Sequence, residues 1–426
     1  MTTPAPLRIM VVDDTITYRM IMKSVAESVA GIVVVSSVNH GRAALDRLGQ
    51  DQPEVVLLDV EMPVLDGLET LKHLRAHHPE IAVVMVSGLS RSNANLVMEC
   101  LQAGALDFVT KPLEANATRA REALRRDLEP ILTLLLQKRE LQAKRATARA
   151  PTPVAPSTTP AAATTTTPAP AAAATPRPLP PRAPVPARPV SATPPPPPPS
   201  PTPASGGATV AATPAPAPRP PASPAPRPVP RRTTPPRPNM LLIGSSTGGP
   251  AALTRLLASL GRPLTIPTLI VQHMPPVFTA SLAVQLARTS GLDVREAQEG
   301  LPVEPGRVIL AMGGVHMVVK NQGQHFDIAL DDGPKVNECR PAVDVLFQSV
   351  AEQAKGEFLA VILTGMGRDG TQGVEQLKAR HPTWCIAQDK ESCVVYGMPR
   401  AVEEGGLADE VLPLDKIGPR ILELCR

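Results

Sequence analysis

Long apolar runs are missing from this chain of 426 residues. No apolar segment approaches the roughly 20 residues needed to cross a bilayer, and no N-terminal signal sequence precedes the first expected strand. Cysteine is also scarce, because the five cysteines are odd in number, lack metal-ligand spacing and stand mostly in apolar surroundings. That usage is typical of reduced thiols. The sequence therefore predicts a cytoplasmic protein with no membrane-inserted segment.

Acidic residues are missing from one long stretch, residues 151–238, which also lacks lysine and aromatic residues but holds 33 of the 53 prolines. Such a Pro, Ala and Thr composition cannot bury enough apolar surface to offset the entropy of ordering, so we expect a disordered linker with polyproline character. The eight arginines of this stretch contribute a charge of +8. Because the whole chain has a net charge of +4, the rest of the chain carries −4. A basic nucleic-acid-binding surface is not indicated, and no nucleic-acid partner is expected.

The remaining sequence forms two blocks in which short apolar strands alternate with helical periodicity. Strands of this near-continuous apolar kind are buried on both faces, which indicates α/β domains with parallel sheets covered by helices. We predict a doubly wound domain of five strands over residues 6–125, with strands at RIMVV, IVVVSSV, EVVLL, IAVVMV and DFVT. A second doubly wound parallel-sheet domain is predicted over residues 239–426, in which VILA and HMVVK are expected to pair as a hairpin.

Residues 126–238 are predicted to contain a helical extension followed by the linker. The extension is interrupted by Pro130 and then continues as the amphipathic segment ILTLLLQKRELQAKR. Two interpretations stay open, since the segment fits either a C-terminal helix of the first domain that frays into the linker or a helix that contacts the second domain.

Polar residues close the strands of the first block. They are Asp13 and Asp14 after the first strand, Asp59 after the third, Ser87 after the fourth and Lys111 after the fifth. In a doubly wound sheet the carboxyl ends of the strands share one crevice. Neighbouring carboxylates repel each other unless a divalent cation neutralises them, and oxygen ligands favour Mg²⁺. An aspartate at a strand end is also a common turn or helix cap, but here four strand ends agree.

This crevice is suited to capture of a phosphoryl group. Asp59 can attack phosphorus while Mg²⁺ and Lys111 offset the charge on the transferring oxygens. Ser87 can then donate its hydroxyl to the new phosphoryl group. The sequence therefore predicts a phosphorylation switch.

In the motifs VVDD, LLDVEMPVLDG, MVSG and FVTKP, the first block resembles response-regulator receiver domains. The resemblance implies that Asp59 is the phosphoacceptor. It implies that Asp14, Asp59 and the backbone carbonyl of Glu61 bind Mg²⁺, with help from Asp13. It also implies that Phe108 is the aromatic residue that rotates with the switch and that a histidine kinase donates the phosphoryl group.

A glycine-rich turn, GSSTGGP, opens the second block and places Ser246 in a G-x-S-x-G pattern. Such a turn exposes a nucleophilic serine at a helix N-terminus, but it also fits an anion-binding loop or a plain turn. His273, which follows the strand TLIVQ, is the best candidate base, and Asp369 in the loop TGMGRDG is the best candidate for orienting the imidazole. In the same loop the N–H of Met366 can stabilise an oxyanion. Alone, His273 also fits a structural histidine and Asp369 an ordinary loop acid.

The order Ser, His, Asp excludes the α/β-hydrolase fold, in which the acid precedes the histidine. In IGSSTGGP, LIVQHMPPVFTASLA, ILTGMGRDG and AQDKESCVVYGMPRAV, the second block resembles the chemotaxis-type protein-glutamate methylesterase (CheB) family. The resemblance implies Ser246 as nucleophile, His273 as base, Asp369 as orienting acid and Met366 N–H as oxyanion donor. Ser245 stands where the family usually has alanine, so two adjacent serines compete for the role of nucleophile.

The resemblance implies a phosphorylation-activated enzyme that hydrolyses glutamyl methyl esters on the cytoplasmic helices of methyl-accepting chemoreceptors. Glutamine side chains are expected to react in the same way, with loss of ammonia. Two other classes remain as alternatives. One is a phosphorylation-controlled binding module whose GSSTGG turn holds an anion, and the other is a DNA-binding response regulator, which the negative charge of the folded blocks disfavours.

Overall fold

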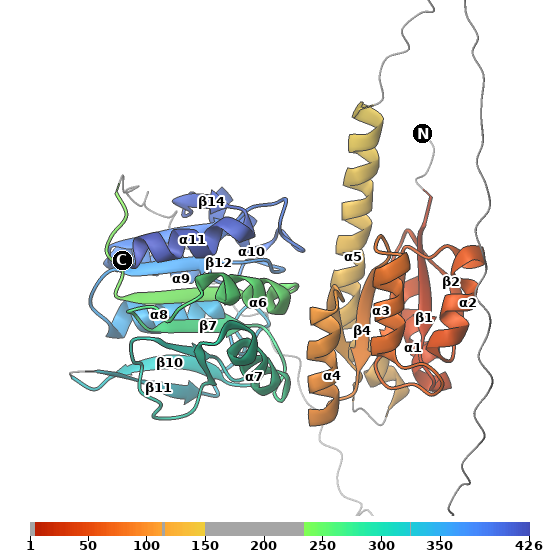
Figure 1. The fold of residues 1–426 in the computed structure, drawn as a ribbon, viewed down its shortest axis with the longest axis horizontal. Helices are drawn as coiled ribbons and strands as arrows, with labels where there is room; N and C mark the ends of the chain where they lie inside the picture. Colours follow the sequence, from red (N-terminus) through yellow and green to blue (C-terminus); the bar gives the residue numbers. More distant parts are fainter. Residues whose placement is uncertain (1–4, 113–115, 150–233, 324) are drawn as a thin grey trace, which may run out of the picture. The chain divides into compact units, whose positions relative to one another are not determined.

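The protein is described by a computed structural model that covers residues 5–112, 116–149, 234–323 and 325–426 (Figure 1). Most of the predicted linker lies outside the described residues. Residues 5–149 are called the first domain and residues 234–426 the second domain below, and each is described by itself. Among the described residues, no helix combines the length and apolar character that crossing a membrane requires.

The first domain is built on a five-stranded parallel sheet in the order β2-β1-β3-β4-β5, which confirms the predicted doubly wound fold. Its strands are β1 (Leu7–Val12), β2 (Ile32–Val38), β3 (Val55–Asp59), β4 (Ala82–Ser87) and β5 (Asp107–Thr110). Every residue of β3 is buried, as expected for a central strand covered on both faces. The helices are α1 (Ile16–Glu27), α2 (Gly41–Asp51), α3 (Gly67–His77), α4 (Arg91–Gln102) and α5 (Ala117–Arg149).

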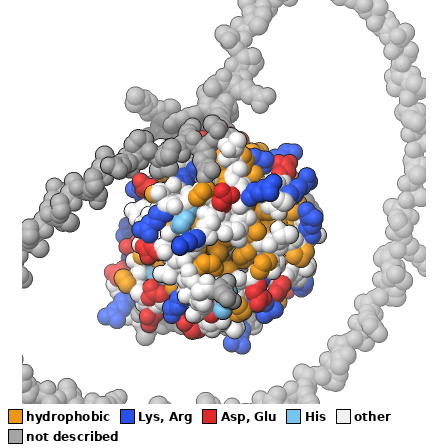
Figure 2. Space-filling model, turned by 90° about the vertical axis from the view of Figure 1, so that its left-hand side faces the viewer, with side chains coloured by type: hydrophobic (Ala, Val, Ile, Leu, Met, Phe, Trp, Pro, Cys, Tyr) orange, Lys and Arg blue, Asp and Glu red, His pale blue; other side chains and the backbone are white. Residues whose placement is uncertain are grey.

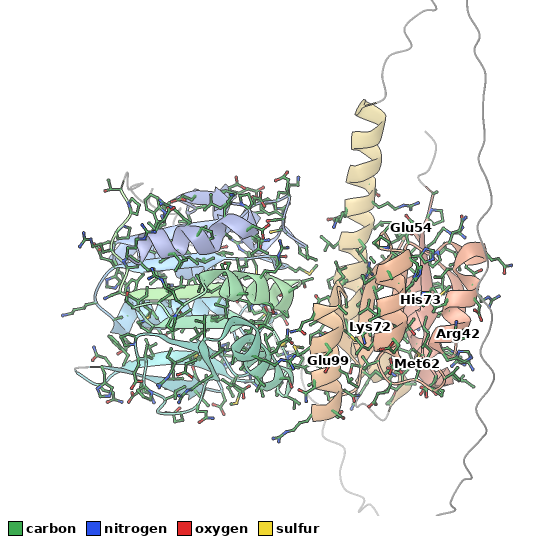
Figure 3. All side chains as sticks on the ribbon, in the orientation of Figure 1. Arg42, Glu54, Met62, Lys72, His73 and Glu99 are labelled. Carbon is green, nitrogen blue, oxygen red and sulfur yellow. The ribbon has the colours of Figure 1, made fainter. Side chains whose placement is uncertain are left out.

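The strands of this sheet all point the same way, so the residues that follow them gather at one edge. Glu54, which precedes β3, and Met62, which follows it, lie at opposite ends of the sheet (Figure 3). The predicted phosphorylation pocket is at the end marked by Met62.

Helix α5 contains the predicted extension and continues through Pro130. Past this proline, Ile131, Leu132 and Leu135 are buried in the same hydrophobic cluster as strands β1 and β3. Further along, Arg139 Nε lies 2.7 Å from Glu54 Oε1. The extension therefore packs against the first domain, in agreement with the first of the two interpretations.

The second domain has a seven-stranded parallel sheet in the order β14-β13-β12-β6-β7-β9-β8. The strands are β6 (Met240–Ser245), β7 (Thr268–Gln272), β8 (Asp293–Glu296), β9 (Arg307–Leu310), β12 (Phe358–Ile362), β13 (Thr383–Gln388) and β14 (Glu410–Leu412). The helices are α6 (Gly249–Leu260), α7 (Phe278–Ser290), α8 (Val343–Gln353), α9 (Thr371–Arg380), α10 (Met398–Glu404) and α11 (Leu414–Leu424). The predicted doubly wound sheet is confirmed.

The predicted hairpin is wrong in its pairing. HMVVK forms β10 (His316–Asn321), but its antiparallel partner is β11 (Phe326–Asp331) and not VILA. VILA supplies β9, which pairs in parallel with β7 and β8. The apolar run of VILA suits a strand buried in the sheet, whereas the half-polar FDIALD suits a hairpin with one covered face.

Strand β6 lies between β7 and β12, although β12 follows it by more than 100 residues in the chain. The register aligns Ser245 with Gln272 and Gly244 with Ile362. The loops after these three strands therefore begin side by side, at the point of a doubly wound sheet where binding crevices form.

Charges of both signs are interspersed on the face of the molecule shown in Figure 2. Lysine and arginine side chains alternate there with aspartate and glutamate and with apolar side chains. This face lacks the continuous basic surface that nucleic-acid binding requires.

Candidate active site

The two candidate nucleophiles have different surroundings. Ser245, the last residue of β6, is fully buried and its Oγ donates a 2.7 Å hydrogen bond to Gln272 Oε1. Ser246 is half-buried and begins the turn to α6, where Gly248 adopts a left-handed φ of 74°. The side chain of Ser245 is thus engaged inside the sheet, whereas Ser246 lies just past the carboxyl end of β6, in the turn to α6.

Gln272 ties the nucleophile segment to the base segment. Its Nε2 donates to the backbone oxygens of Ser246 at 2.9 Å and His273 at 3.0 Å. The backbone N–H of His273 donates in turn to Ser245 O at 3.1 Å. These bonds fix the two loops relative to each other, and Gln272 was not predicted from the sequence.

The structure brings His273 and Asp369 together, as predicted. His273 Nε2 lies 2.7 Å from Asp369 Oδ2, and the acid is 2% exposed. Burial works against ionisation of the imidazole, but the hydrogen bond to Asp369 and a contact with Cys339 outweigh it and raise the pKa of His273 to about 9.

The Asp369 carboxylate is held by four donors. Its Oδ2 accepts from Val343 N at 2.6 Å as well as from His273, and its Oδ1 accepts from Asp344 N at 3.1 Å and Asn337 Nδ2 at 2.8 Å. The two backbone donors are the first residues of α8, where unpaired N–H groups favour a negative charge. Burial opposes ionisation, but these bonds hold the pKa of Asp369 below its usual range.

The turn that carries Asn337 was missed in the sequence. Asn337 and Glu338 both have left-handed φ values, 51° and 62°, between residues Val336 and Cys339, which exchange two backbone hydrogen bonds. Asparagine in a polar segment was the available signal, because it adopts this conformation more readily than most residues. The turn brings an amide onto Asp369 and a thiol onto the imidazole, with Cys339 Sγ 3.4 Å from His273 Nδ1.

Ser246 lies beside the loop that follows β12. Its N–H donates to Thr364 O at 3.0 Å, and a Cβ on Gly365 would stand 2.8 Å from Ser246 Cβ, so only glycine fits there. Among the described residues, Met366 N–H donates to no acceptor and thus remains available, and no hydrogen bond joins Ser246 Oγ to His273. Ser246 therefore lies at the same sheet edge as His273, since β6 and β7 are neighbouring parallel strands.

The predicted phosphorylation pocket is also assembled. Lys111 Nζ lies 2.7 Å from both Asp13 Oδ2 and Asp59 Oδ2. Burial raises the pKa of Asp59 to about 6, although Lys111 acts against this shift. Oxygens of Asp13, Asp14 and Asp59 lie within 4.8 Å of one another, a donor set of oxygens that fits Mg²⁺.

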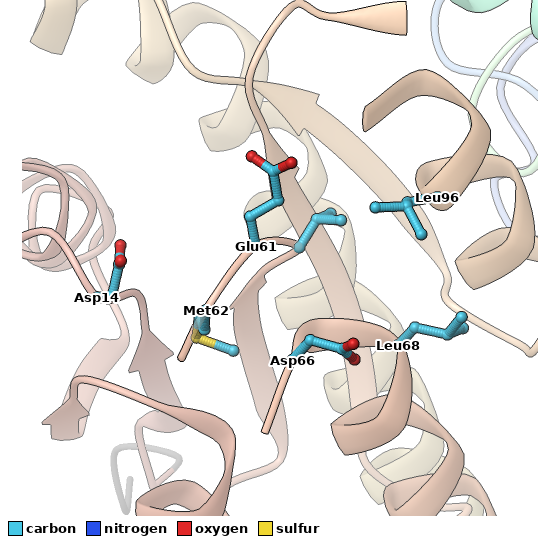
Figure 4. A pocket seen from close by; sticks show the side chains of 7 residues that line it. Asp14, Glu61, Met62, Asp66, Leu68 and Leu96 are labelled. Carbon is cyan, nitrogen blue, oxygen red and sulfur yellow. The ribbon is translucent and has the colours of Figure 1, made fainter. Parts of the chain in front are cut away.

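A cavity of about 430 Å³ opens beside these carboxylates, and Asp14, Glu61 and Met62 are among its lining residues (Figure 4). Ser87 is buried at the end of β4. Its Oγ donates a hydrogen bond to Gly88 O at 3.2 Å and not to Asp59. Phe108 is half-buried in β5. The structure therefore brings Asp13, Asp14, Asp59 and Lys111 together at the carboxyl ends of the strands, whereas Phe108 lies within β5.

Comparison with known proteins decides the family. The sequence model of the CheB methylesterase family matches residues 241–421, and that of the response regulator receiver domain matches residues 9–122. The protein-glutamate methylesterase/protein-glutamine glutaminase of group 2 operon from Rhodopseudomonas palustris is 40% identical over 98% of this chain and 94% of that protein. The chain belongs to the protein-glutamate methylesterase (CheB) family.

Other members of the methylesterase family also match this chain. A protein-glutamate methylesterase/protein-glutamine glutaminase from Desulfotalea psychrophila is 36% identical over 98% of both chains. The solved catalytic domain of the Thermotoga maritima CheB methylesterase is 46% identical, covers 44% of this chain and 98% of that chain, and has a TM-score of 0.43. The resemblance inferred from the motifs is confirmed, and the chain has a receiver domain followed by a CheB catalytic domain.

Proposed function

We propose that the chain is a protein-glutamate methylesterase and protein-glutamine glutaminase in which Ser246 is the nucleophile. The observation that favours this role is the 2.7 Å contact between His273 and Asp369, which follow the two strands on either side of β6, the strand that ends before Ser246. Ser246 is half-buried beside the loop that carries Met366, whose N–H donates to no acceptor among the described residues, and this supports the same assignment.

In the proposed reaction Ser246 Oγ attacks the carbonyl carbon of a glutamyl methyl ester. His273 Nε2 faces Asp369, so Nδ1 takes the serine proton, and the Asp369 carboxylate stabilises the imidazolium. Met366 N–H donates to the oxyanion. Collapse of the intermediate expels methanol, which takes the proton from Nδ1 and leaves an acyl-serine.

Water then attacks the acyl-serine by the same route. His273 Nδ1 accepts the proton of the water and returns one to Ser246 Oγ as the glutamate carboxylate leaves. With a glutamine side chain the first leaving group is ammonia in place of methanol. Both reactions need the neutral imidazole, because only that form accepts a proton.

The receiver domain is proposed to control the esterase activity through its phosphorylation. Asp59 attacks the phosphorus of a phosphodonor, and Lys111, whose Nζ lies 2.7 Å from Asp59 Oδ2, stabilises the phosphoryl oxygens. Asp13, Asp14, Asp59 and the backbone carbonyl of Glu61 would hold Mg²⁺. When bound, the ion would neutralise charge on the transferring group. Ser87 and Phe108 are proposed to respond to phosphorylation, which relieves inhibition by the receiver domain.

The proposed partners are a chemotaxis histidine kinase as phosphodonor and the cytoplasmic helices of methyl-accepting chemoreceptors as substrate. The test is release of labelled methanol from methyl-labelled receptor cytoplasmic fragments, with and without a small phosphodonor and Mg²⁺. We expect turnover in both samples and more in the phosphorylated one. Absence of methanol release from the phosphorylated protein would refute the proposed activity.

A further inference from the structure

One cysteine differs from the others in its surroundings. Burial raises the pKa of four of the thiols to about 11 or about 12. These four are Cys100, Cys385, Cys393 and Cys425. Cys339 is half-buried, and its sulfur lies 3.4 Å from His273 Nδ1. A neighbouring imidazolium is one of the groups that favour the thiolate form of a cysteine.

The position of Cys339 is fixed by the turn that precedes it. Val336 N donates to Cys339 O at 3.1 Å and Cys339 N to Val336 O at 2.9 Å, which closes the turn around Asn337 and Glu338. Asn337 Nδ2 is bonded to Asp369 Oδ1, on the carboxylate that orients the imidazole. Thiol and imidazole are therefore both anchored to Asp369.

In the proposed mechanism, Nδ1 of His273 would have to interact with both Cys339 and Ser246. Nε2 is engaged by Asp369, so the proposed mechanism needs Nδ1 for the proton of Ser246. The sulfur of Cys339 is the group in contact with Nδ1 in this structure. We propose that Cys339 and Ser246 share His273 Nδ1, which makes Cys339 the reactive thiol of the chain and a site where modification by a soft electrophile stops ester hydrolysis. The second half of this inference rests on the proposed function.

The chemistry follows from the contact. The raised pKa of His273 means that at neutral pH the imidazole already carries a proton on Nδ1, so the thiol proton leaves to solvent and the thiolate stands next to an imidazolium as a net neutral pair. With an alkyl halide the sulfur forms a bond to carbon, the carbon–halogen bond breaks and halide leaves, while the proton stays on Nδ1. The added group then stands where Ser246 must reach the imidazole, so hydrolysis stops.

Iodoacetamide labelling of the full-length protein at neutral pH tests the thiol without any ester substrate. Peptide mass spectrometry gives the rate at each cysteine, and Cys425 is the matched control because it is also half-buried but distant in sequence from the imidazole. We expect labelling of Cys339 to be at least about tenfold faster than that of Cys425. His273→Asn should slow labelling of Cys339 by about tenfold and leave Cys425 unchanged, because the thiolate loses its partner.

A second measurement links the thiol to hydrolysis. Wild-type protein and Cys425→Ser should lose methanol release in proportion to labelling at Cys339, whereas Cys339→Ser should hydrolyse equally fast before and after treatment. Equal rates at Cys339 and Cys425, no effect of His273→Asn, or full activity of protein labelled at Cys339 would each overturn the proposal. If untreated protein releases no methanol, the proposed function fails, and the labelling rates still decide whether the thiol is activated.

Discussion

Ser245 Oγ donates a hydrogen bond to Gln272 Oε1 at 2.7 Å. This bond gives Ser245 a structural role that differs from the role of the adjacent Ser246. The hydroxyl of Ser245 is used to hold the side chain of Gln272. The amide nitrogen of Gln272 then binds the backbone oxygens of Ser246 and His273. Ser245 therefore supports the geometry of the crevice, while Ser246 is left to react.

Substitution of either serine distinguishes these roles. Ser246→Ala should lower kcat for methanol release by at least about a thousandfold, because the acyl-enzyme can no longer form. Ser245→Ala should retain turnover and lower the free energy of unfolding by about 1–3 kcal/mol, since Gln272 Oε1 loses its buried donor. Comparable activity losses in the two variants would contradict the assignment of the nucleophile.

Hydrolysis should become faster as the pH rises towards about 9. His273 must be neutral to accept the serine proton, and its pKa in the folded protein is raised to about 9. Below this value kcat/KM should fall about tenfold for each unit of pH. The measurement is methanol release from pH 6 to pH 10, with the Ser246→Ala protein subtracted as the background of alkaline ester hydrolysis. A profile that is flat between pH 7 and pH 9 would contradict it.

Asp344 should make the catalytic domain less stable as the pH rises from about 4 to about 6. Burial and the neighbouring Asp369 raise the pKa of Asp344 from 3.8 to about 6. The folded state therefore binds more protons than the unfolded state in this window, and stability falls with pH. Relative to Asp344→Asn, the wild-type free energy of unfolding should decrease across the window by at most about 3 kcal/mol.

Trp384 allows this measurement in the full-length chain. It is the single tryptophan of the sequence and is buried in β13, where its Nε1 donates to Glu410 Oε1 at 2.8 Å. Its fluorescence in urea therefore follows the second domain and not the first. A wild-type minus Asp344→Asn difference that stays constant or rises between pH 4 and pH 6 would show that Asp344 keeps an ordinary pKa.

Asp59→Asn should leave basal hydrolysis in place and remove its stimulation by a small phosphodonor. An amide cannot form the phosphoryl anhydride, although it preserves the shape of the side chain. Asp46→Asn is the matched control, because this exposed carboxylate of α2 lies outside the pocket. Stimulation of methanol release should persist in the control. If Asp59→Asn is stimulated as strongly as the wild type, the input is located elsewhere.

The sequence allowed the parallel sheets to be predicted because their strands are short apolar runs that end in polar residues. Asp59 and His273 could be placed at strand ends by the same pattern, and Asp369 in the loop that follows a strand. The sequence did not predict which strands pair. FDIALD, which forms β11, alternates only weakly between apolar and polar residues, so HMVVK was predicted to pair with VILA instead. Periodicity identifies a strand, but its neighbour depends on packing.

The contacts of the Asp369 carboxylate could not be predicted from the sequence, because they also depend on how separate segments pack. Asn337 meets the carboxylate only because two consecutive left-handed residues reverse the chain, and α8 adds its N-terminal N–H groups from a separate element. Neither contact corresponds to a recognisable motif or residue spacing in the sequence. Gln272 could be read as the last residue of a strand, but its amide bonds depend on the register of β6 and β7.

The central position of β6, between β7 and β12, has a consequence for local motion. The loops of Ser246, His273 and Asp369 each follow a strand whose every residue is buried. Opening the crevice by fraying would require breaking the middle of the sheet, which is the costliest part to open. The amides of β6, β7 and β12 should therefore exchange with deuterium only through global unfolding of the domain. Heat inactivation should then coincide with the unfolding of Trp384.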